Sequence, residues 1–276
     1  MTKAVETFMP KELPSCWYPM PLSRRSLLTM AAVGVVTGLS ATTLPSARGA
    51  GRHAFKAVAF DAFTTFDTRS IDALTEQLFP GSGGELVKAW RTRQFEYTWL
   101  RTLSRSYVDF WQVTEQALVM AAKLVKVTLT SEKRDRLMQA FLEIRAWPDA
   151  AEALRHMKES GLKLAFLSNA TPTMLDAWVK NSGLDGIFEP HLSTDRVKAF
   201  KPDPRAYQMG VDAFALRRDE ILFAAFGGWD AVGAKAFGYP CFWVNRAGVP
   251  LEELGFNPDG VGSTLRDVES FVAQYA

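Results

Sequence analysis

The sequence predicts an α/β fold in which a parallel β-sheet is covered by helices on both faces and carries an inserted helical subdomain. Short runs that are apolar throughout alternate with segments of helical period, as expected of strands buried on both faces of a parallel sheet. The stretch 70–145 interrupts this alternation with helical period alone. The chain has 276 residues and is 47% hydrophobic, which is enough to bury a large core.

The predicted elements follow in chain order. The first buried strand is the apolar run at residues 55–60, and four helices follow it at 71–79, 84–104, 108–127 and 131–144. Further strands are expected at 162–171, 187–193, 221–227 and 240–246, and helices at 148–161, 172–183, 203–216, 229–238 and 264–276. Gly161 and Gly183 should end two of these helices, and Thr264 with Asp267 should form a capping box at the start of the last one.

The four consecutive helices define the domain organisation. Because they follow the first strand directly, we expect them to lie as a cap over the carboxyl end of that strand. Residues 51–69 and 146–276 are predicted to form a Rossmann-like core, and residues 70–145 the helical cap.

The first fifty residues have the three-part layout of a bacterial export signal. Arg24 and Arg25 precede a weakly apolar run at residues 27–44, and small residues follow near Ala47. The arginine pair is typical of the twin-arginine type. An uncleaved membrane helix is the alternative, but Gly34 and Gly38 make the run a poor span. We therefore expect residues 1–50 to be removed, and the protein to reach the periplasm through the twin-arginine translocase.

The charge of the expected mature chain gives no reason to expect a nucleic-acid partner. Removal of residues 1–50 takes away five of the 32 basic residues and two of the 30 acidic residues, so the net charge changes from +2 to −1. Cys16 lies in the expected signal, so Cys241 is the single cysteine of the expected mature chain. Neither a disulfide nor a cysteine-based zinc site is therefore expected.

Polar side chains follow successive strands of the predicted sheet. They are, in chain order, Asp61 and Thr65, Ser168 and Asn169, Lys201, and Asp230. Because the carboxyl ends of parallel strands meet at one edge of the sheet, we expect these side chains to converge there. A lone aspartate at a strand end is more often a cap or turn residue, but burying several polar groups together is costly unless they have a function.

These residues resemble the motifs of a known family. Asp61, Ser168, Lys201 with Pro202, and Asp230 match the four motifs of the haloacid dehalogenase superfamily. The chain is also similar to the (S)-2-haloacid dehalogenase branch in the cap segment at 89–118 and in the segments at 167–177, 201–207 and 227–246. This resemblance runs from residue 57 to the C-terminus.

Two features distinguish the chain from the phosphatases of that superfamily. Those enzymes place an acid two residues after the nucleophile to protonate the leaving group, and they hold magnesium with further acids. Here the downstream position is Phe63, and Asp230 is the single acid near the fourth motif, which leaves too few oxygen ligands for a hard dication. A halide leaves as a stable anion and needs no proton. We therefore expect no metal and no cofactor, with Asp61 as a carboxylate nucleophile and Phe63 lining an apolar pocket for the halogenated carbon.

The resemblance implies roles for the other residues. Lys201 and Ser168 would hold the carboxylates of Asp61 and the substrate, Thr65 would lie near the nucleophile, and Asp230 would orient Lys201 or assist the hydrolytic water. The expected substrate-binding residues are Arg91, which would receive the halide or bind the substrate, and Asn169, Tyr207, Phe63, Phe95, Phe110 and Trp229. The alternatives are a cap ion pair for Arg91, a half-buried helix position for Tyr207, a plain helix cap for Asp230, and ordinary core positions for the aromatic residues.

The chain also departs from the branch. Phe63 and Thr64 stand where Tyr and Gly are usual, in a loop that is one residue shorter, and Ala225, Gly227 and Thr92 stand where Ser, Asn and Gln are usual. Loss of such donors weakens catalysis if they act in the transition state. These departures fit either an altered substrate or a weakened enzyme.

The sequence thus predicts hydrolysis of short-chain 2-haloacids to 2-hydroxyacids, through an ester on Asp61 and with inversion. The alternative is an exported protein that keeps the fold and binds a small carboxylate without turnover, and a phosphatase is a distant third. The expected partners are a halogenated carboxylate, the translocase and, from the resemblance, a second copy in a homodimer.

Overall fold

The computed structural model describes residues 54–189 and 191–275. The expected export signal at residues 1–50 lies outside these residues. Within the part of the chain that is described, no helix is long and apolar enough to span a lipid bilayer.

A six-stranded parallel sheet forms the core, with the strand order β5-β4-β1-β6-β7-β8. The central strand β1 (Ala57–Phe60) pairs with β4 (Lys163–Ser168) on one side and with β6 (Ile221–Ala225) on the other. The outer strands are β5 (Leu192–Ser193), β7 (Cys241–Val244) and β8 (Gly260–Gly262). The predicted parallel sheet is confirmed, and the carboxyl ends of β1, β4 and β6 lie at one edge of it.

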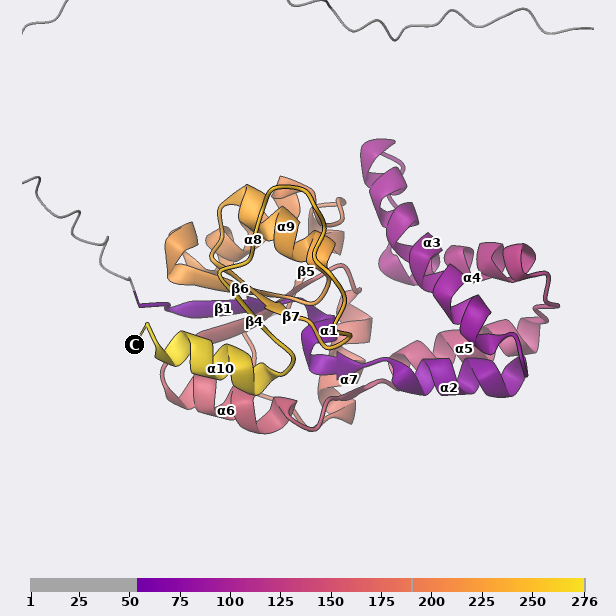
Figure 1. Cartoon of the computed structure of the whole chain (residues 1–276), viewed down its shortest axis with the longest axis horizontal. Helices are drawn as coiled ribbons and strands as arrows, with labels where there is room; N and C mark the ends of the chain where they lie inside the picture. Colours follow the sequence, from indigo (N-terminus) through magenta and orange to yellow (C-terminus); the bar gives the residue numbers. More distant parts are fainter. Residues whose placement is uncertain (1–53, 190, 276) are drawn as a thin grey trace, which may run out of the picture. The chain divides into compact units, whose positions relative to one another are not determined.

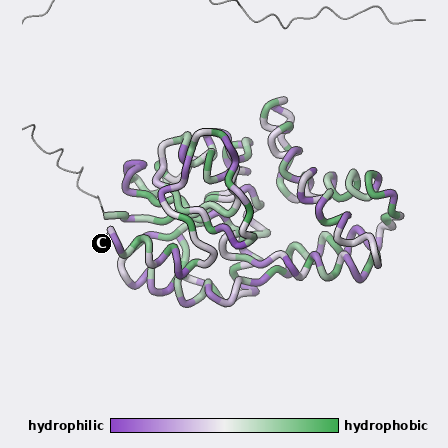
Figure 2. Tube along the Cα trace, viewed as in Figure 1, coloured by the Kyte–Doolittle hydropathy of each residue, from purple (hydrophilic) through white to green (hydrophobic). Residues whose placement is uncertain are grey.

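Helices cover both faces of this sheet, as predicted (Figure 1). Along β1, Val58 and Phe60 enter one buried cluster and Ala57 and Ala59 enter the other, because successive side chains of a strand point to opposite faces. One cluster contains the helices α6 (Ala150–Glu159), α7 (Pro172–Asn181) and α10 (Leu265–Ala273), and the other contains α8 (Pro204–Phe214) and α9 (Gly228–Phe237). The central strands β1 and β6 are therefore apolar throughout, whereas the helices alternate polar and apolar residues (Figure 2).

The inserted segment consists of α2 (Arg69–Leu78), α3 (Gly83–Leu103), α4 (Phe110–Val125) and α5 (Ser131–Leu142). It is flanked by β2 (Phe66–Asp67) and β3 (Arg145–Ala146), which pair antiparallel with each other. The chain therefore leaves the core and returns to it at adjacent positions. Within the insertion α3 packs on α4, where the Trp90 indole N–H donates to the carbonyl of Thr114 at 2.8 Å.

Several short elements were not predicted. They are α1 (Ala62–Thr65), β2, β3, β8 and the 3₁₀ turns η1 (Thr194–Arg196) and η2 (Arg218–Glu220), all too brief to produce a periodic pattern. Among the described residues of the strand predicted at 187–193, only Leu192–Ser193 form a strand, β5, while Phe188 packs its ring on Phe166 with centroids 4.0 Å apart. The capping box of Thr264 and Asp267 is confirmed.

Candidate functional site

Asp61 lies at the carboxyl end of the central strand and begins the one-turn helix α1. Its Oδ1 accepts a hydrogen bond from the backbone N–H of Phe63 at 2.8 Å, which caps the helix. Its Oδ2 accepts a hydrogen bond from Nζ of Lys201 at 2.6 Å. The residue is only 6% exposed. Both carboxylate oxygens are therefore held in a fixed direction.

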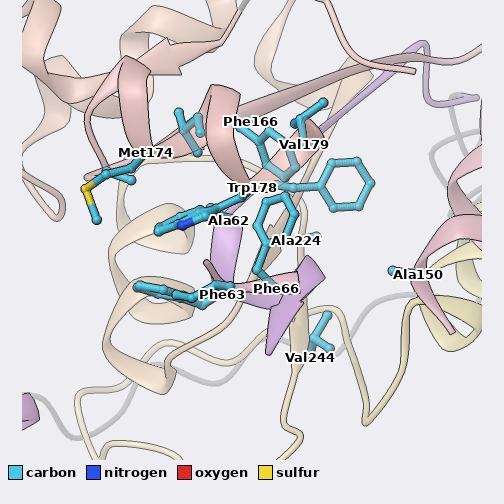
Figure 3. Close-up of a cluster of buried hydrophobic side chains, with 14 of the residues drawn as sticks. Ala62, Phe63, Phe66, Ala150, Phe166, Met174, Trp178, Val179, Ala224 and Val244 are labelled. Carbon is cyan, nitrogen blue, oxygen red and sulfur yellow. The ribbon is translucent and has the colours of Figure 1, made fainter. Parts of the chain in front are cut away.

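An aromatic cluster supports α1 (Figure 3). The ring of Phe63 lies 5.7 Å from that of Trp178 and 5.7 Å from that of Phe226, and Phe66 lies 5.4 Å from Trp178. Phe63 is buried in these surroundings. The position two residues after Asp61 therefore provides a buried apolar side chain and no proton donor.

Lys201 is fully buried between two carboxylates. Its Nζ donates to Oδ2 of Asp61 and to Oδ2 of Asp230, each at 2.6 Å. Burial disfavours the charged ammonium, but the carboxylates of Asp230 and Asp61 outweigh burial and raise the pKa of Lys201. The lysine therefore stays protonated, and it joins the ends of β1 and β6 into one charged cluster.

Asn169 holds the loop that carries Lys201. Its Oδ1 accepts hydrogen bonds from the backbone N–H of Lys201 at 2.9 Å and from the hydroxyl of Thr194 at 3.4 Å. This contact orients Lys201 through its backbone. The contact with substrate that the sequence predicts for Asn169 stays a prediction.

Asp230 is the third member of the cluster and lies in the first turn of α9, fully buried. Burial raises the pKa of Asp230 to about 6, against the lowering effect of Lys201. The hydroxyl of Tyr207 donates to Oδ1 of Asp230 at 2.6 Å. Both oxygens of Asp230 are thus engaged, which favours the interpretation that it orients Lys201.

Tyr207 differs in position from the expectation. We expected it to contact the substrate, or else to be half-buried, but it is fully buried behind Asp230, with its ring packed against Phe237 and Phe223. Burial and the neighbouring Asp230 carboxylate raise the pKa of Tyr207 well above its usual value. Tyr207 therefore acts on the site through Asp230.

Ser168 and Thr65 lie at the same edge of the sheet, and both are buried. The Ser168 hydroxyl accepts a hydrogen bond from the backbone N–H of Ala170 at 3.1 Å and so shapes the turn after β4. The Thr65 hydroxyl lies 3.4 Å from that of Thr64. In this structure Ser168 therefore supports the backbone after β4, and Thr65 contacts the hydroxyl of its neighbour Thr64.

One face of α3 brings the cap onto the core. Phe95 and Trp99, four residues apart and so on one face of the helix, pack on Trp229 with ring centroids 5.3 and 5.8 Å from it. Trp229 is the residue before Asp230, so the cap contacts the core beside the charged cluster. Trp99 was not predicted as a site residue, although its spacing from Phe95 could have indicated it.

The cap also contacts the residue before Lys201. Phe110 is buried with its ring 6.3 Å from that of Phe200, and Tyr107 lies 4.9 Å from the same ring. The backbone N–H of Phe200 donates to the Thr102 hydroxyl at 3.0 Å. The predicted pocket residue Phe110 thus helps to place the Lys201 loop.

Arg91 lies one turn before Phe95 on α3. Its Nη2 is 3.5 Å from Oδ1 of Asp72 on α2, and its guanidinium lies over the ring of Phe141. Burial lowers the pKa of Arg91, although Asp72 opposes this effect. The structure thus places Arg91 in the cap ion pair that the sequence left as an alternative. The Nη2 atom of Arg91 is buried and makes no hydrogen bond, and the Asp72 carboxylate is its ion-pair partner.

The indole of Trp229 lies over Gly227. A Cβ atom at position 227 would lie 2.6 Å from Nε1 of Trp229. A residue with a side chain there would require the indole to move. Gly227 therefore leaves room for the indole of Trp229 to lie against the backbone.

The residues around Asp61 do not suit a divalent cation. The position between the carboxylates of Asp61 and Asp230 is taken by the Lys201 ammonium. Among the residues at 54–189 and 191–275, no group of three or more His, Cys, Asp or Glu side chains is arranged to hold a metal ion.

Comparison with known proteins identifies relatives over most of the chain. A family model described as haloacid dehalogenase-like hydrolase matches residues 29–238. The (S)-2-haloacid dehalogenase of Pseudomonas sp. (strain YL) is 42% identical over 214 residues, which is 77% of this chain and 92% of that protein. Haloacetate dehalogenase H-2 of Moraxella sp. (strain B) is 38% identical over 205 residues, which is 74% of this chain and 92% of that protein.

Solved structures agree with these relatives. A crystal structure of an L-2-haloacid dehalogenase matches with a TM-score of 0.78 and 40% identity, covering 80% of this chain and 99% of that one. The L-2-haloacid dehalogenase of Xanthobacter autotrophicus, with chloropropionic acid covalently bound, matches with a TM-score of 0.74 and 33% identity over 80% of this chain and 100% of that one.

We predict that Lys201→Met destabilises the protein strongly, because it leaves two carboxylates buried without their shared cation. The free energy of unfolding at neutral pH should fall by about 3–5 kcal/mol, as measured by urea denaturation. Lys198→Met is the matched control, since Lys198 pairs with Asp195 while 61% exposed and should contribute less than about 1 kcal/mol. Equal effects of the two substitutions would contradict the prediction.

Proposed function

The chain belongs to the (S)-2-haloacid dehalogenase family of the haloacid dehalogenase-like hydrolases, and we propose that it hydrolyses short-chain 2-haloacids to 2-hydroxyacids through an ester on Asp61. One observation carries this proposal. The Asp61 carboxylate is held at both oxygens, by the Phe63 N–H and by Lys201, at the end of a strand and two residues before the buried apolar side chain of Phe63. A fixed carboxylate next to apolar surroundings suits attack on a carbon that bears a halogen.

The first step would form a bond between an Asp61 oxygen and C2 of the substrate, while the bond from carbon to halogen breaks and the halide leaves with the electron pair. Attack from the side opposite the halogen inverts the carbon, so an (S)-2-haloacid gives an (R)-2-hydroxyacid. Phe63 supplies no proton and none is required. Lys201 would bind the carboxylates, and Arg91, which pairs with Asp72 in this structure, would receive the halide.

The second step would be attack of water on the Asp61 carbonyl carbon, which releases the hydroxyacid and restores the carboxylate. Asp230 keeps Lys201 charged and in place during this step, since its two oxygens are engaged by Tyr207 and Lys201. In the Xanthobacter autotrophicus relative, chloropropionic acid is covalently bound, which supports an ester in this chain.

The alternative of a binding protein without turnover is less well supported. The full charged cluster of Asp61, Lys201 and Asp230 is retained and buried, and such a cluster is costly unless it is used. Activity on 2-chloropropionate, 2-bromopropionate and chloroacetate distinguishes the two, since a binding protein would retain a carboxylate and release no halide.

We predict that solvent oxygen enters Asp61 before it enters the product. In a single turnover in heavy-oxygen water, the label should appear in the peptide that contains Asp61 and be absent from the hydroxyacid, because water attacks the ester carbonyl of Asp61. Mass spectrometry of the digested protein and of the product measures both. Label in the product alone would show direct attack by water.

Two controls accompany that experiment. Asp61→Asn should lower halide release by on the order of 10⁴-fold or more, because a neutral amide is a poor nucleophile. EDTA should leave halide release unchanged, whereas loss of activity that magnesium restores would assign phosphatase-type chemistry to the site.

We predict that halide release falls as the pH drops through about 6, where Asp230 takes up a proton and no longer holds Lys201. The hydroxyl of Tyr207 lowers the pKa of Asp230, so Tyr207→Phe should move this acid limb to higher pH by about one unit. The measurement is kcat/KM against pH for both proteins.

The matched control for the pH experiment is Tyr239→Phe. This substitution also removes a buried hydroxyl, but one that donates to the backbone carbonyl of Tyr207 and not to Asp230. Its acid limb should stay at the wild-type position. An unshifted limb in Tyr207→Phe would mean that Asp230 does not control the acid side of the profile.

We further propose export to the periplasm by the twin-arginine translocase, on the basis of Arg24 and Arg25 and the apolar run that follows them. Changing both arginines to lysine should leave the precursor in the cytoplasm, as measured by cell fractionation, and unaltered export would refute this route.

A homodimer remains a prediction from the resemblance. Sedimentation of the mature protein would measure its oligomeric state.

A further inference from the structure

The nucleophile depends on a helix that is too short to be stable alone. Asp61 caps α1, which contains four residues, and an isolated turn of this kind gains too few hydrogen bonds to offset its ordering. The N-terminal end of α1 is capped by the Asp61 side chain itself. The carbonyl groups at the last residues have no further helical turn to bind them, so they need partners from elsewhere.

Arg246 binds a backbone carbonyl at the C-terminal end of α1. Its Nη2 and Nε both donate to the backbone carbonyl of Thr64, at 2.8 and 3.1 Å. The carbonyl of Thr65 accepts a hydrogen bond from the backbone N–H of Trp147 at 2.9 Å. The last two carbonyls of α1 are thus bound by residues that lie far away in the sequence.

Arg246 is itself fixed on its remaining sides. Its side chain is 8% exposed, and its two terminal nitrogens donate to the two carboxylate oxygens of Asp149 at 3.0 and 2.9 Å. Nη1 also donates to the carbonyl of Ser263, and the guanidinium lies 4.6 Å from the centre of the Trp147 ring. A planar guanidinium suits such a site, because its donors are arranged in a rigid fork.

The partner carboxylate stays ionised. Burial opposes ionisation of Asp149, but hydrogen bonds from Arg246 and from the backbone N–H of Leu265 outweigh it and hold the pKa of Asp149 below its usual value. The Arg246 site is therefore a fully paired ion pair that joins the nucleophile helix, the return from the cap at Trp147 and the start of α10.

We infer that Arg246 is a positioning residue, which sets the direction of the Asp61 carboxylate by capping the carboxyl end of α1. This inference rests on the proposed function only for its kinetic readout. Arg246 bonds to the backbone of Thr64 and touches no atom of Asp61. When it is removed, α1 can tilt, and the carboxylate loses its alignment with Lys201 and with the carbon under attack.

The test compares Arg246→Met with a matched control, Arg218→Met. Arg218 also binds the last carbonyl of a helix, since its Nη1 donates to the carbonyl of Phe237 at 2.7 Å and its guanidinium lies over the Phe237 ring, at the end of α9 away from Asp61. Arg246→Met should lower kcat for halide release by on the order of 10²-fold, with KM close to the wild-type value, because small misplacements of a nucleophile cost about this much. Arg218→Met should keep the wild-type kcat.

A third variant and a second readout separate positioning from loss of folding. Arg246→Lys can still donate one hydrogen bond to Thr64 and should recover part of the kcat. Hydrogen exchange of the backbone amides of Phe63 and Thr64, which bind Asp61 in the native protein, should be faster in Arg246→Met than in Arg218→Met. This exchange needs no substrate, so it tests the inference even if the proposed dehalogenation fails. Unaltered exchange, or an unaltered kcat in a folded Arg246→Met protein, would overturn the inference.

Discussion

The buried ammonium of Lys201, shared by Asp61 and Asp230, is the interaction on which the rest of the site depends. Two carboxylates within reach of one atom would repel each other in an apolar interior, and one of them would take up a proton. Lys201 keeps the cluster charged, at 2.6 Å from each partner. The parallel sheet makes this geometry available, because β1 and β6 are neighbours and their carboxyl ends carry the two acids.

Residues outside the charged cluster of Asp61, Lys201 and Asp230 hold its members in position. Tyr207 engages the second oxygen of Asp230, Asn169 binds the backbone of Lys201, and Arg246 binds the helix that Asp61 begins. Each of these contacts restrains a different member of the cluster. Two uncharged residues lie near the cluster: Gly227 is covered by the Trp229 indole, and Phe63 is part of an aromatic cluster. The charge of the site is therefore confined to Asp61, Lys201 and Asp230.

Much of the fold could be predicted from the sequence because strands and helices of ordinary length have a recognisable period. The apolar runs at β1, β4, β6 and β7 marked a sheet buried on both faces, and the unbroken helical stretch marked the insertion. Residues at the carboxyl ends of those runs, such as Asp61 and Ser168, were located in the same way. The elements α1, β2, β3 and β8 were not predicted, because two to four residues are too few for any period to appear.

The sequence by itself determined the parallel sheet, the positions of its main strands along the chain and the edge at which Asp61, Lys201 and Asp230 meet, whereas the order of the strands in the sheet came from the structure. Only the tertiary structure decided where the side chains of Tyr207, Arg91, Trp99 and Arg246 lie. Tyr207 lies behind Asp230, Arg91 contacts Asp72 within the cap, Trp99 packs on Trp229, and Arg246 binds the carbonyl of Thr64. The physical reason is that a strand end is fixed by local pattern and sheet geometry, whereas the direction of a long side chain depends on partners far away along the chain.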